Sequence, residues 1–597
     1  MNWQRCRPLW RAISTPEEIP GVEKTIRRRA VDPPAAWQDT PLHPLLARVY
    51  AARGVADPAD LELGLGQLLR PERLLHADRA AAVLADAIAA DRHILIVGDY
   101  DADGATSTAL AVAALRAFGA KNVGYLVPNR FEYGYGLTPE IVELALAQGS
   151  PELIVTVDNG ISSIDGVAAA RDAGITTVIT DHHLAGQTLP QADVIVNPNQ
   201  DGCTFPSKNL AGVGVIFYIM LALRSELRER GWFREREAPN LGQFTDLVAL
   251  GTVADVVPLD RNNRILVAAG LQRIRQGQAR PGIMALLEVA SRSSQSVVAS
   301  DLGFAVGPRI NAAGRLDDIS LGIECLLQED WSAARELAAA LHQKNQDRRI
   351  IEADMQDQAL RLLDDLSVAA DAAPIAMTLY QADWHQGVIG ILASRIKDRL
   401  HRPTIAFADG DPGEIKGSAR SIPGIHIRDI LDAVATRHPG MILKFGGHAM
   451  AAGLTLPRKA YADFQRAFTE EVERHARDVH LQAVVESDGE LSPRDLSLET
   501  ATTLRYAGPW GQHFPEPVFD GVFDVVHQRL VGEKHLKLVL SAPGSGELLD
   551  AIAFNVDLQR WPDPSATQLQ LAYRLDVNEY RGRSSVQLVV EHIVPSR

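Results

Sequence analysis

A chain of 597 residues is too long for one ordinary hydrophobic core, so we expect two to four domains. Its 46% hydrophobic and 23% charged residues are typical of an ordinary folded protein and exclude a disordered chain. The net charge of −15 argues against a simple polyanion-binding protein, although carboxylates that hold cations also count as negative in this total.

The cysteines and the apolar segments indicate a cytoplasmic protein. Cys6, Cys203 and Cys325 form no CxxC pair, so we expect neither a zinc site nor a disulfide framework. The N-terminus lacks the apolar core of a signal peptide. The longest apolar stretch, residues 211–223, is shorter than the roughly 20 residues that cross a bilayer, and it predicts a buried helix instead.

The pattern along the chain predicts several parts. Residues 1–60 are rich in proline and arginine, and we interpret them as an arm rather than a domain. Helical and strand-like segments alternate over residues 61–330, which predicts an α/β catalytic domain with a mainly parallel sheet. Residues 331–371 predict a long connecting helix, and residues 372–481 a second, smaller α/β domain. Residues 482–597 contain short apolar pieces bounded by Gly and Pro, which predict a small β-barrel.

Potential metal ligands follow three strands of the first domain, which are predicted at residues 93–97, 152–157 and 176–180. The strand-end residues are Asp99, Asp101 and Asp103 after the first, Asp158 after the second, and Asp181, His182 and His183 after the third. A further strand is predicted at 193–198, and Asp255 lies where an apolar helix ends before a proline. Because the carboxyl ends of parallel strands line one crevice, we expect these side chains to meet.

The ligand types predict a pair of divalent cations. Oxygen-rich sites with one or two imidazoles suit Mn²⁺ or Mg²⁺ better than a metal that prefers thiolates. Such cations would neutralise the three closely spaced aspartates. Two cations about 3.5–4 Å apart are a recurring device for cleaving phosphoesters.

Each motif alone has a simpler explanation. The aspartate run is similar to part of a calcium loop, but the twelfth position counted from Asp99 is Leu110 rather than glutamate. The segment GDYDADG does not match the GxGxxG fingerprint, so dinucleotide binding is disfavoured. A histidine after a strand is often a capping or core residue. Ligand-type residues at three consecutive strand ends are harder to explain in this way.

The motifs resemble those of the DHH phosphoesterase family. DYDADG, VTVDNG, TDHH and GTVADVVPL, in this order, are similar to its first four motifs, and GGHAMAAG (446–453) is similar to the glycine motif of its second, DHH-associated domain. GPRINAAGR (307–315), WHQGVIGILASRI (384–396) and GSARS (417–421) are further matches. The resemblance covers residues 75–460, and the predicted C-terminal barrel resembles an OB-fold more weakly.

The resemblance implies which residues hold the two cations. The implied ligands are Asp101 and Asp158, with Asp99 as a further candidate, for one cation, and Asp103, Asp158, His182 and Asp255 for the other. Asp158 would bridge the two, and His183 would contact the scissile phosphate. Residue 97 is Val where small-substrate pyrophosphatases of the superfamily have histidine, which favours an exonuclease.

The second half of the chain is expected to bind phosphates. Arginine suits bidentate phosphate contacts, and adjacent glycines let backbone N–H groups approach an anion. The candidates are Arg309, Arg315, Ser418, Arg420, Gly446, Gly447 and His448, with Arg130 as another phosphate contact and Tyr135 or Tyr133 as a base-stacking residue. A surface salt bridge would explain any one of these arginines, and a tight turn would explain the glycines.

The resemblance implies a single-strand-specific DNA exonuclease of DNA repair and recombination that works 5′→3′ and releases 5′-mononucleotides. A terminal 5′-phosphate anchored by Arg309, Arg420 and Ser418 would place the metals one nucleotide in. A groove between the lobes would admit single strands, and the barrel would track the strand. The barrel candidates are Lys534, Lys537, Tyr580 and Arg581. A single-strand-binding protein and a RecQ-type helicase are partners implied by the resemblance alone, and no membrane partner is expected.

Other functions remain open at this point. One is a DHH-family phosphodiesterase acting on short oligoribonucleotides or cyclic dinucleotides, against which the length and the third domain argue. Another is a non-catalytic single-strand DNA-binding scaffold, which the intact metal-ligand set disfavours. A structural metal-binding protein would leave the arginine and glycine motifs without a role.

Overall fold

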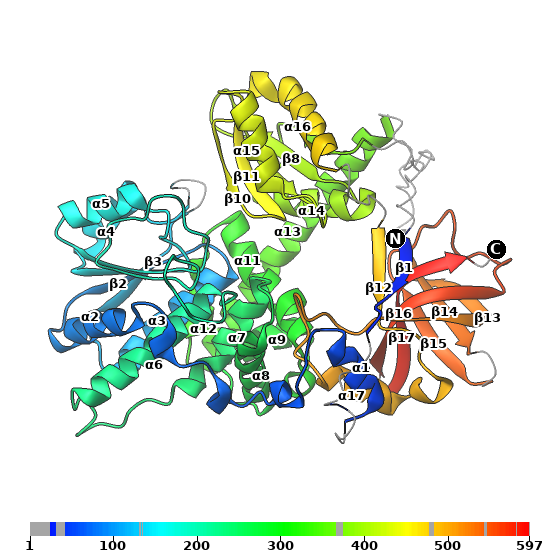
Figure 1. Ribbon diagram of the computed structural model, residues 1–597, viewed down its shortest axis with the longest axis horizontal. Helices are drawn as coiled ribbons and strands as arrows, with labels where there is room; N and C mark the ends of the chain where they lie inside the picture. Colours follow the sequence, from blue (N-terminus) through cyan, green and yellow to red (C-terminus); the bar gives the residue numbers. More distant parts are fainter. Residues whose placement is uncertain are drawn as a thin grey trace, which may run out of the picture.

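The computed structural model describes residues 24–31, 37, 42–129, 133, 135–365, 374–476, 483–542, 546–580 and 582–595. Their strands form two five-stranded sheets, a closed barrel and a two-stranded pair, which belong to three bodies, and a long helix runs between two of these bodies (Figure 1). Among the described helices, none combines the length and apolarity that crossing a membrane requires.

The sheet of the first domain is parallel throughout and runs in the order β3-β2-β4-β5-β6. Its strands are β2 (Ile94–Gly98), β3 (Val123–Leu126), β4 (Leu153–Val157), β5 (Thr176–Thr180) and β6 (Val194–Val196). The chain leaves β2 toward one edge, through β3, and then returns to the other side of β2 with β4. Open parallel sheets bind ligands where the strand order reverses in this way, which here is between β2 and β4.

Helices cover both faces of this sheet, so its strands are buried on both sides. Ile94 and Ile96 of β2 belong to one core, and the alternate residues Leu95 and Val97 belong to the other. The helices on the first face are α2 (Ala77–Ala89), α3 (Ala102–Phe118) and α6 (Gly212–Glu229), and those on the second are α4 (Pro139–Gly149) and α5 (Ile164–Asp172). Helix α6 contains residues 212–223 of the apolar stretch, with Ala211 as its N-cap, and confirms the stretch as a buried helix.

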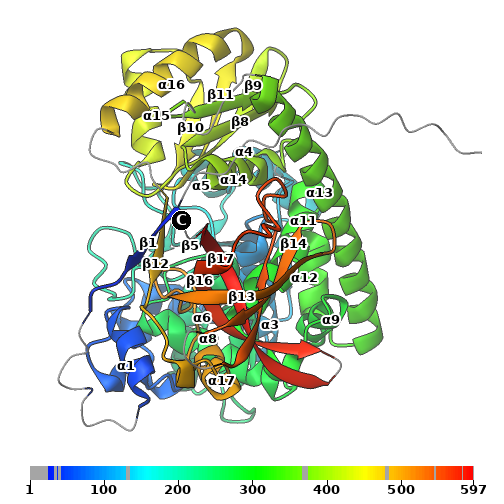
Figure 2. The same cartoon turned by 90° about the vertical axis from the view of Figure 1, so that its right-hand side faces the viewer.

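Further helices extend the first domain toward the second. They are α7 (Thr245–Ala254), α8 (Arg261–Arg275), α9 (Pro281–Val289), α10 (Ala299–Asp301), the π-helix η7 (Leu302–Val306), α11 (Gly307–Leu316) and α12 (Ser320–Leu327). The predicted connecting helix is confirmed as α13 (Trp331–Asp365), which runs beside the domain toward the second lobe (Figure 2). The last residues of the predicted segment, 366–371, lie outside the described part of the chain.

The second lobe is a mixed sheet in the order β10-β11-β9-β8-β7, in which only β7 and β8 are parallel. Its strands are β7 (Met377–Tyr380), β8 (Thr404–Asp409), β9 (Glu414–Arg420), β10 (Lys444–Gly447) and β11 (Ala451–Pro457). Its helices are α14 (Ile389–Leu400), α15 (Ile427–Arg437) and α16 (Tyr461–His475). The structure thereby confirms the predicted second α/β domain.

The C-terminal strands close into a barrel in the order β13-β14-β15-β17-β16. They are β13 (Phe519–Val531), β14 (His535–Ser541), β15 (Leu548–Ala553), β16 (Gln568–Tyr580) and β17 (Arg583–Pro595), and α17 (Leu498–Tyr506) precedes them. The pair β15 and β17 is parallel, and the other pairs are antiparallel. A five-stranded barrel of this kind is typical of the OB-fold, which confirms that expectation.

The N-terminal segment crosses to the barrel side of the molecule. Strand β1 (Lys24–Arg28) pairs in parallel with β12 (Ala483–Ser487), and the two lie side by side in both views (Figures 1 and 2). Helix α1 (Pro44–Ala51) follows, and the Tyr50 hydroxyl donates a hydrogen bond of 2.6 Å to the Ala507 carbonyl. The described part of the segment interpreted as an arm therefore contacts the beginning of the C-terminal domain. The domain boundaries stay predictions.

Two local features differ from the sequence prediction. Strand β3 was missed because it is a short edge strand whose two central residues are only half buried. The sequence pattern alone predicts a helix over residues 105–118, but α3 begins at Ala102, because the Asp101 carboxylate accepts hydrogen bonds from the Asp103 and Gly104 amides and caps the helix there.

Candidate metal centre and nucleic-acid site

The first aspartates lie at the turn between β2 and α3. Asp101 Oδ1 accepts hydrogen bonds of 2.9 and 3.0 Å from the amides of Asp103 and Gly104, so the first turn of α3 stabilises its charge. A Cβ atom at Gly104 would lie 2.3 Å from the Asp99 carbonyl oxygen. Glycine at this position therefore allows the tight turn that places three carboxylates at one strand end.

Asp103 is held by the N-terminus of α6. Its Oδ2 accepts a hydrogen bond of 2.6 Å from the Gly212 amide, and its Oδ1 accepts one of 3.0 Å from the Val213 amide. The residue before α6, Ala211, gives no side-chain cap, so Asp103 satisfies amides that would otherwise be unpaired. The buried helix α6 thus positions a carboxylate that follows β2.

Asp158 lies at the end of β4 with its backbone in the left-handed region, at φ +63°. A non-glycine residue rarely adopts this conformation, and such strain clusters at functional sites. The Asn159 side chain fixes the turn by donating to the carbonyls of Val97 and Val157, at 3.0 and 2.9 Å. The strand ends on both sides of the reversal in strand order are thereby joined.

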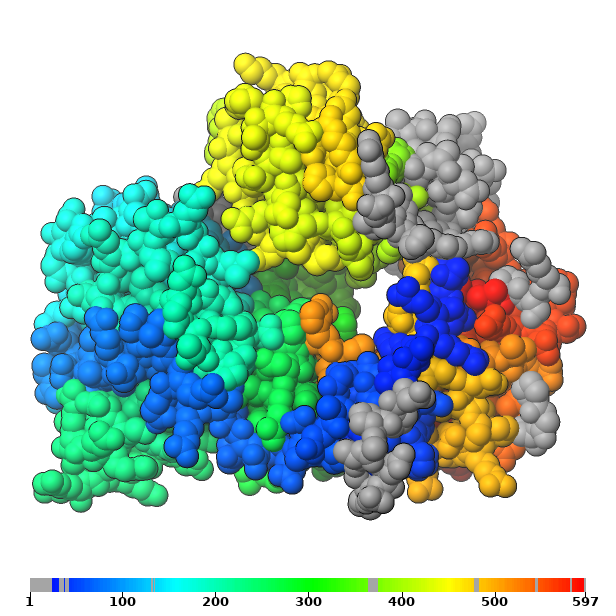
Figure 3. All heavy atoms as spheres, in the orientation of Figure 1, coloured from blue at the N-terminus to red at the C-terminus, as the bar shows by residue number. Residues whose placement is uncertain are grey.

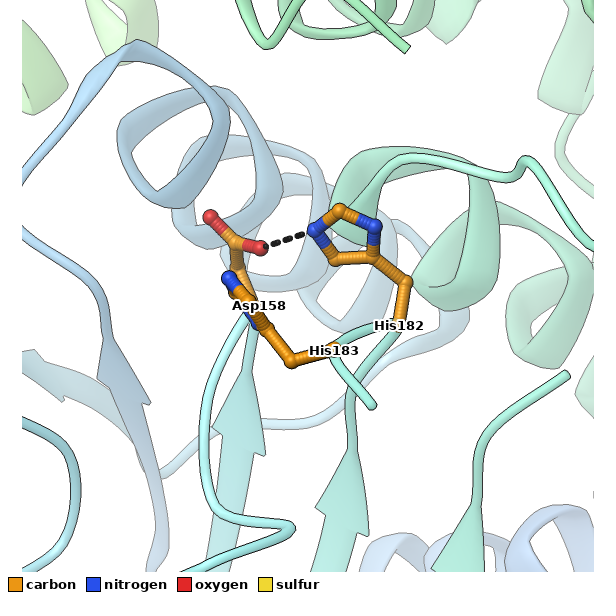
Figure 4. Close-up of side chains that lie close together, drawn as sticks. All are labelled: Asp158, His182 and His183. Atoms are coloured by element: carbon orange, nitrogen blue, oxygen red, sulfur yellow. Dashed lines mark ion pairs between the residues drawn. The ribbon is translucent and has the colours of Figure 1, made fainter. Parts of the chain in front are cut away.

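His182 points at two of the carboxylates. Its Nε2 lies 3.1 Å from Asp158 Oδ1 (Figure 4). The same atom lies 3.5 Å from Oδ2 of Asp255, which caps the C-terminal end of α7. All three atoms are buried and have no hydrogen-bond partner among the residues that the structure describes. Buried polar atoms are normally paired, so three converging atoms without partners fit a bound cation.

The potential ligand atoms fall into groups that lie within 4.8 Å of one another. The groups are Asp99, Asp101 and Asp158; Asp103, His182 and Asp255; and Asp158, His182 and His183. The first group contains the ligands implied for one cation, and the second contains those implied for the other except Asp158, which belongs to the first and third groups. The structure therefore brings all six implied ligands together, while the role of each residue stays a prediction.

The carboxylates destabilise one another when they are charged. Burial, and then the charge of Asp255, raise the pKa of Asp103 to about 7. Burial, and then the charge of Asp101, raise the pKa of Asp255 to about 8, and burial with its aspartate neighbours raises the pKa of Asp158 well above its usual range. Divalent cations at these ligands would remove this repulsion.

The His183 ring is oriented by Asp181, the first residue after strand β5. Asp181 Oδ1 accepts a hydrogen bond of 2.7 Å from His183 Nδ1, and its Oδ2 accepts one of 2.9 Å from the Ile161 amide. Burial opposes charge on both groups, but their mutual hydrogen bond lowers the pKa of Asp181 to about 2 and raises that of His183 to about 9. His183 is therefore a protonated donor beside the carboxylates in the metal-free protein.

Tyr135 lies over this histidine. Its hydroxyl lies 3.3 Å from the Asp158 carbonyl oxygen, and its ring contacts the Tyr100 and His183 rings edge to face. The position agrees with the predicted contact to substrate, which stays a prediction. Arg130 lies outside the described residues.

The second lobe reaches the same histidines through the glycine motif. The His448 ring stacks on the His183 ring, with centroids 5.9 Å apart and planes at 22°. A Cβ at Gly447, whose φ is +149°, would lie 2.4 Å from the Ala451 carbonyl oxygen, so only glycine fits this turn. A Cβ at Gly446 would meet nothing within 4 Å, so a ligand can approach its backbone.

Arg420 and Ser418, on strand β9, lie against the first turn of helix α14. Arg420 Nη1 donates hydrogen bonds to Ser418 Oγ at 3.1 Å and to the Ala419 carbonyl at 2.8 Å. A Cβ at Gly390, in the first turn of α14, would lie 2.8 Å from Arg420 Nη2 and 2.9 Å from Ser418 Oγ. Within the described chain no carboxylate pairs with Arg420, and burial lowers its pKa. A partly buried cation beside a helix N-terminus favours a bound phosphate.

The other two arginines of the second half are engaged inside the fold. Arg309 donates from Nη1 to the Ala305 carbonyl at 2.5 Å and from Nε to His342 Nδ1 at 3.1 Å. Arg315 Nη1 donates to the Gly387 carbonyl at 3.2 Å and so connects α11 to the second lobe. These contacts give both residues a structural role, and phosphate binding by them stays a prediction.

The barrel candidates are only partly described. Lys537 Nζ lies 3.0 Å from Asp550 Oδ2, so an ion pair on the barrel already uses its charge. Lys534 lies in the turn between β13 and β14. The side chain of Tyr580 and the whole of Arg581 lie outside the described part of the structure.

Sequence reasoning missed several residues that build the site. Asn311 Oδ1 accepts a hydrogen bond of 2.8 Å from the Ala102 amide and so joins the INAAG motif to the first turn of α3. A Cβ at Gly251 would lie 2.8 Å from Asp103 Oδ1, and one at Gly314 would lie 2.1 Å from the Tyr100 carbonyl oxygen. The motifs contained these residues, but only the packing reveals what each one touches.

Three family models match the chain in the same order as the three bodies of the structure. They are the DHH family, N-terminal domain (residues 93–252), the DHHA1 domain (372–474) and the RecJ OB domain (487–592). The single-stranded-DNA-specific exonuclease RecJ of Dickeya dadantii is 57% identical over 578 residues, which cover 96% of this chain and 100% of that protein.

Solved structures agree with this assignment. The structure of RecJ from Thermus thermophilus in complex with Mn²⁺ has a TM-score of 0.79 at 28% identity, over 96% of this chain and 80% of that chain. The complex of the same protein with Mg²⁺ has a TM-score of 0.73 at 27% identity, over 96% and 79%. The chain therefore belongs to the RecJ family of single-stranded-DNA-specific exonucleases.

Proposed function

We propose that this protein is a metal-dependent exonuclease that degrades single-stranded DNA from the 5′ end and releases 5′-mononucleotides, in DNA repair and recombination. The observation that carries the proposal is the convergence of buried carboxylate and imidazole atoms without hydrogen-bond partners, among the described residues, at the reversal point of the sheet. The relatives named above are exonucleases of this specificity, and two of their structures contain Mn²⁺ or Mg²⁺. The cofactor is accordingly Mn²⁺ or Mg²⁺.

The cations would be held by Asp99, Asp101 and Asp158 on one side and by Asp103, His182 and Asp255 on the other. When bound, they supply a water molecule of lowered pKa and charge neutralisation at the phosphate. His183, oriented by Asp181, donates a hydrogen bond to a non-bridging phosphate oxygen. Hydrolysis joins the water oxygen to phosphorus and breaks the bond to the 3′ oxygen, so the remaining strand again begins with a 5′-phosphate.

Polarity follows from an anchor for the terminal 5′-phosphate. Arg420, Ser418 and the first turn of α14 form this anchor in the second lobe. The stacked rings of His448 and His183 join that lobe to the carboxylates. A strand held by its end in this way presents the first phosphodiester, and no other, to the carboxylates.

Single-strand selectivity follows from the arrangement of the three bodies. The space-filling view shows an opening between the second lobe, the first domain and the paired strands β1 and β12 (Figure 3). The barrel borders the same side of the molecule, where an OB-fold can hold the trailing strand. Lys534 would contribute charge to this contact, whereas Lys537 would first have to leave its ion pair with Asp550. A single-strand-binding protein, a RecQ-type helicase and a cytoplasmic location remain predictions.

The decisive experiment compares 5′-labelled with 3′-labelled single strands in the presence of Mn²⁺ or Mg²⁺. The 5′ label should be released first as a mononucleotide, and duplex DNA and short oligoribonucleotides should be poor substrates. The Asp158→Asn variant should lose cleavage and keep DNA binding, because asparagine tolerates the left-handed backbone but lacks the bridging charge. Asp165→Asn, at the start of α5, is the matched control. Release of the 3′ label first, or cleavage by Asp158→Asn at the wild-type rate, would contradict the proposal.

A further inference from the structure

The buried face of α13 is shared by the first domain and the second lobe. Among the described residues of this helix, the buried ones recur at alternating intervals of four and three, which is the spacing of a helix packed along one face. They are Ala334, Ala338, Leu341, Asn345, Arg348, Glu352, Met355 and Ala359. The first three belong to the core of the first domain, and the last two belong to a core of the second lobe. The helix therefore passes from one core to the other within a single stripe.

The centre of this stripe is polar. Asn345, Arg348 and Glu352 are 1%, 9% and 7% exposed, and Arg348 Nη2 donates a hydrogen bond of 3.1 Å to Asn345 Oδ1. Apolar contact is non-directional, whereas charged hydrogen bonds hold their partners in a defined geometry. A buried ion pair adds little stability over apolar residues of the same volume, and its best-attested use is to specify one arrangement. The polar section lies where the two lobes meet, so it can specify how they are arranged.

Glu352 connects this polar section to the second lobe. Its Oε2 accepts a hydrogen bond of 2.6 Å from Arg348 Nη1, and its Oε1 accepts one of 2.9 Å from Nε of Arg395 on α14. Further along α13, Gln358 Oε1 accepts a hydrogen bond of 2.8 Å from Trp384 Nε1. Glu352 and Arg395 thus form an ionic contact between the long helix and the second lobe, the interlobe link.

The helix that carries Arg395 also forms part of the phosphate anchor. A Cβ at Gly390, in the first turn of α14, would lie 2.8 Å from Arg420 Nη2 and 2.9 Å from Ser418 Oγ. Arg395 lies about 7.5 Å further along the axis of the same helix. A shift of α14 at the interlobe link therefore moves the anchor with it.

Helix α11 connects the metal centre to the same part of the second lobe. Near its middle, Asn311 Oδ1 accepts a hydrogen bond of 2.8 Å from the Ala102 amide, in the turn that carries the metal ligands. At its end, a Cβ at Gly387 would lie 2.2 Å from the Arg315 carbonyl oxygen, so α11 lies directly against the loop before α14. Helix α13 packs on both α11 and α14. The metal centre and the anchor are therefore connected through packed helices.

We propose that Glu352 and Arg395 are positioning residues that fix the distance between the 5′-phosphate anchor and the metal centre. This inference rests on the proposed exonuclease function, and both residues act through α14 rather than by touching the substrate. With the interlobe link intact, a bound 5′-phosphate places the first phosphodiester at the carboxylates, so the phosphate increases the rate of cleavage as well as the affinity. Without the link the phosphate still binds, but the phosphodiester is no longer held in the reactive position.

The test compares strands with a 5′-phosphate and strands with a 5′-hydroxyl. Arg395→Gln breaks the interlobe link and leaves Glu352 paired with Arg348, so α13 keeps its buried ion pair. In single turnovers with Mn²⁺, the ratio of first-cleavage rates for the two ends should fall by about tenfold or more, since a misplacement of about 1 Å can cost about 100-fold. The ratio of Kd values for the two ends, measured in chelator, should equal that of wild type. Glu352→Gln should lower the same rate ratio.

The matched control is Glu288→Gln. Glu288 Oε1 lies 3.0 Å from Nη2 of Arg335 on α13, but this ion pair lies within the first domain. The variant should keep both ratios. An unchanged rate ratio in Arg395→Gln, or an equal loss of rate for both kinds of end, would overturn the positioning role and leave the exonuclease intact. A changed Kd ratio would also overturn it, because Arg395 would then belong to the anchor itself. Failure of the wild-type protein to release 5′-mononucleotides would contradict the proposed function instead.

Discussion

Gly212 of α6 lies against Asp158 so closely that a Cβ atom at position 212 would be 2.5 Å from the Asp158 Cβ and 2.7 Å from its Oδ1. The Gly212 amide also donates to Asp103 Oδ2 at 2.6 Å. Gly212 therefore contacts both carboxylates: its missing side chain leaves room for Asp158, which follows β4, and its amide binds Asp103, which follows β2. The start of a buried helix, far from both aspartates in sequence, sets how close the two can lie.

Gly212→Ala should displace Asp158 without unfolding the protein, because position 212 has an ordinary helical backbone that alanine accepts. We expect metal affinity and activity to fall by about 10- to 100-fold, the range found when residues that support metal ligands are changed. A titration of activity with Mn²⁺ measures the loss. Gly64→Ala, where a Cβ would meet nothing within 4 Å, is the control and should keep wild-type affinity. Equal Mn²⁺ titrations for the two variants would contradict this role.

Removal of the metal should make stability depend on pH. In the metal-free protein the pKa of Asp103 is raised to about 7 and that of Asp255 to about 8, so the folded state binds more protons than the unfolded chain. The free energy of unfolding then falls as pH rises through these values. We expect the Tm of chelator-treated protein to fall from about pH 4, where these carboxyls ionise in the unfolded chain, to about pH 8, where they ionise in the folded protein. Added Mn²⁺ should restore it most at the alkaline end.

Two histidines act alongside these acids. His182, whose pKa is lowered by burial, opposes the trend below the usual histidine range, whereas His183, whose pKa is raised to about 9, extends the fall above it. Asp255→Asn removes one of the two titrating carboxylates, so its Tm should depend less steeply on pH. A metal-free wild type with a flat profile across the window, or an Asp255→Asn profile as steep as that of wild type, would be inconsistent with the repulsion between these acids.

Much of the catalytic sheet could be predicted from the sequence because parallel strands buried on both faces are continuous apolar runs. The segments 152–157 and 176–180 correspond to β4 and β5, and their carboxyl ends carry Asp158 and His182 as expected. Strand β3 lacks this signal because it lies at the sheet edge. The pairing of β1 with β12 joins segments some 459 residues apart, and no local pattern indicates such a contact.

The candidate site was predictable where the chemistry depends on residue type and not where it depends on packing. Aspartates and histidines at strand ends indicate a cation site. Gly212 and Gly390 look like any helical glycine in the sequence, and only the structure shows that each lies against a charged side chain. Arg309 shows the reverse, since an arginine that suits a phosphate is used to hold η7 to α13.

Arg420 should determine the preference for a phosphorylated 5′ end. It lies partly buried beside Gly390 at the start of α14, and within the described structure its hydrogen-bond partners are Ser418 and the Ala419 carbonyl rather than a carboxylate. Arg420→Ala should reduce the ratio of kcat/KM for 5′-phosphate over 5′-hydroxyl ends by about tenfold or more, as for loss of a charged hydrogen bond. Lys416→Ala, on the same strand β9 but paired with Asp411 at 3.8 Å, is the control. A ratio equal to that of wild type would exclude Arg420 from the anchor.

The N-terminal segment should be held to the barrel domain by one buried acid. Asp488 accepts hydrogen bonds from Arg29 at 3.1 Å, from Arg53 at 3.0 Å and from the Val518 amide at 3.1 Å. The side chains of Arg53 and Asp488 are 1% and 0% exposed. Removal of one partner leaves a buried charge uncompensated, which costs about 3–5 kcal/mol. Asp488→Ala should therefore destabilise the C-terminal domain by about this amount in urea unfolding.

The neighbouring ion pair of Arg27 and Glu486 provides a control, because its removal also deletes a carboxylate but leaves no buried charge without a partner. It joins the same two strands, β1 and β12, but lies at the surface, where an ion pair contributes only about 0–1 kcal/mol. Glu486→Ala should consequently leave the unfolding midpoint nearly unchanged. Asp488→Ala should also expose residues 24–53 to limited proteolysis, because both β1 and α1 lose their common anchor. Equal midpoints and equal cleavage patterns for the two variants would mean that strand pairing alone, and not the buried acid, holds the two ends of the chain together.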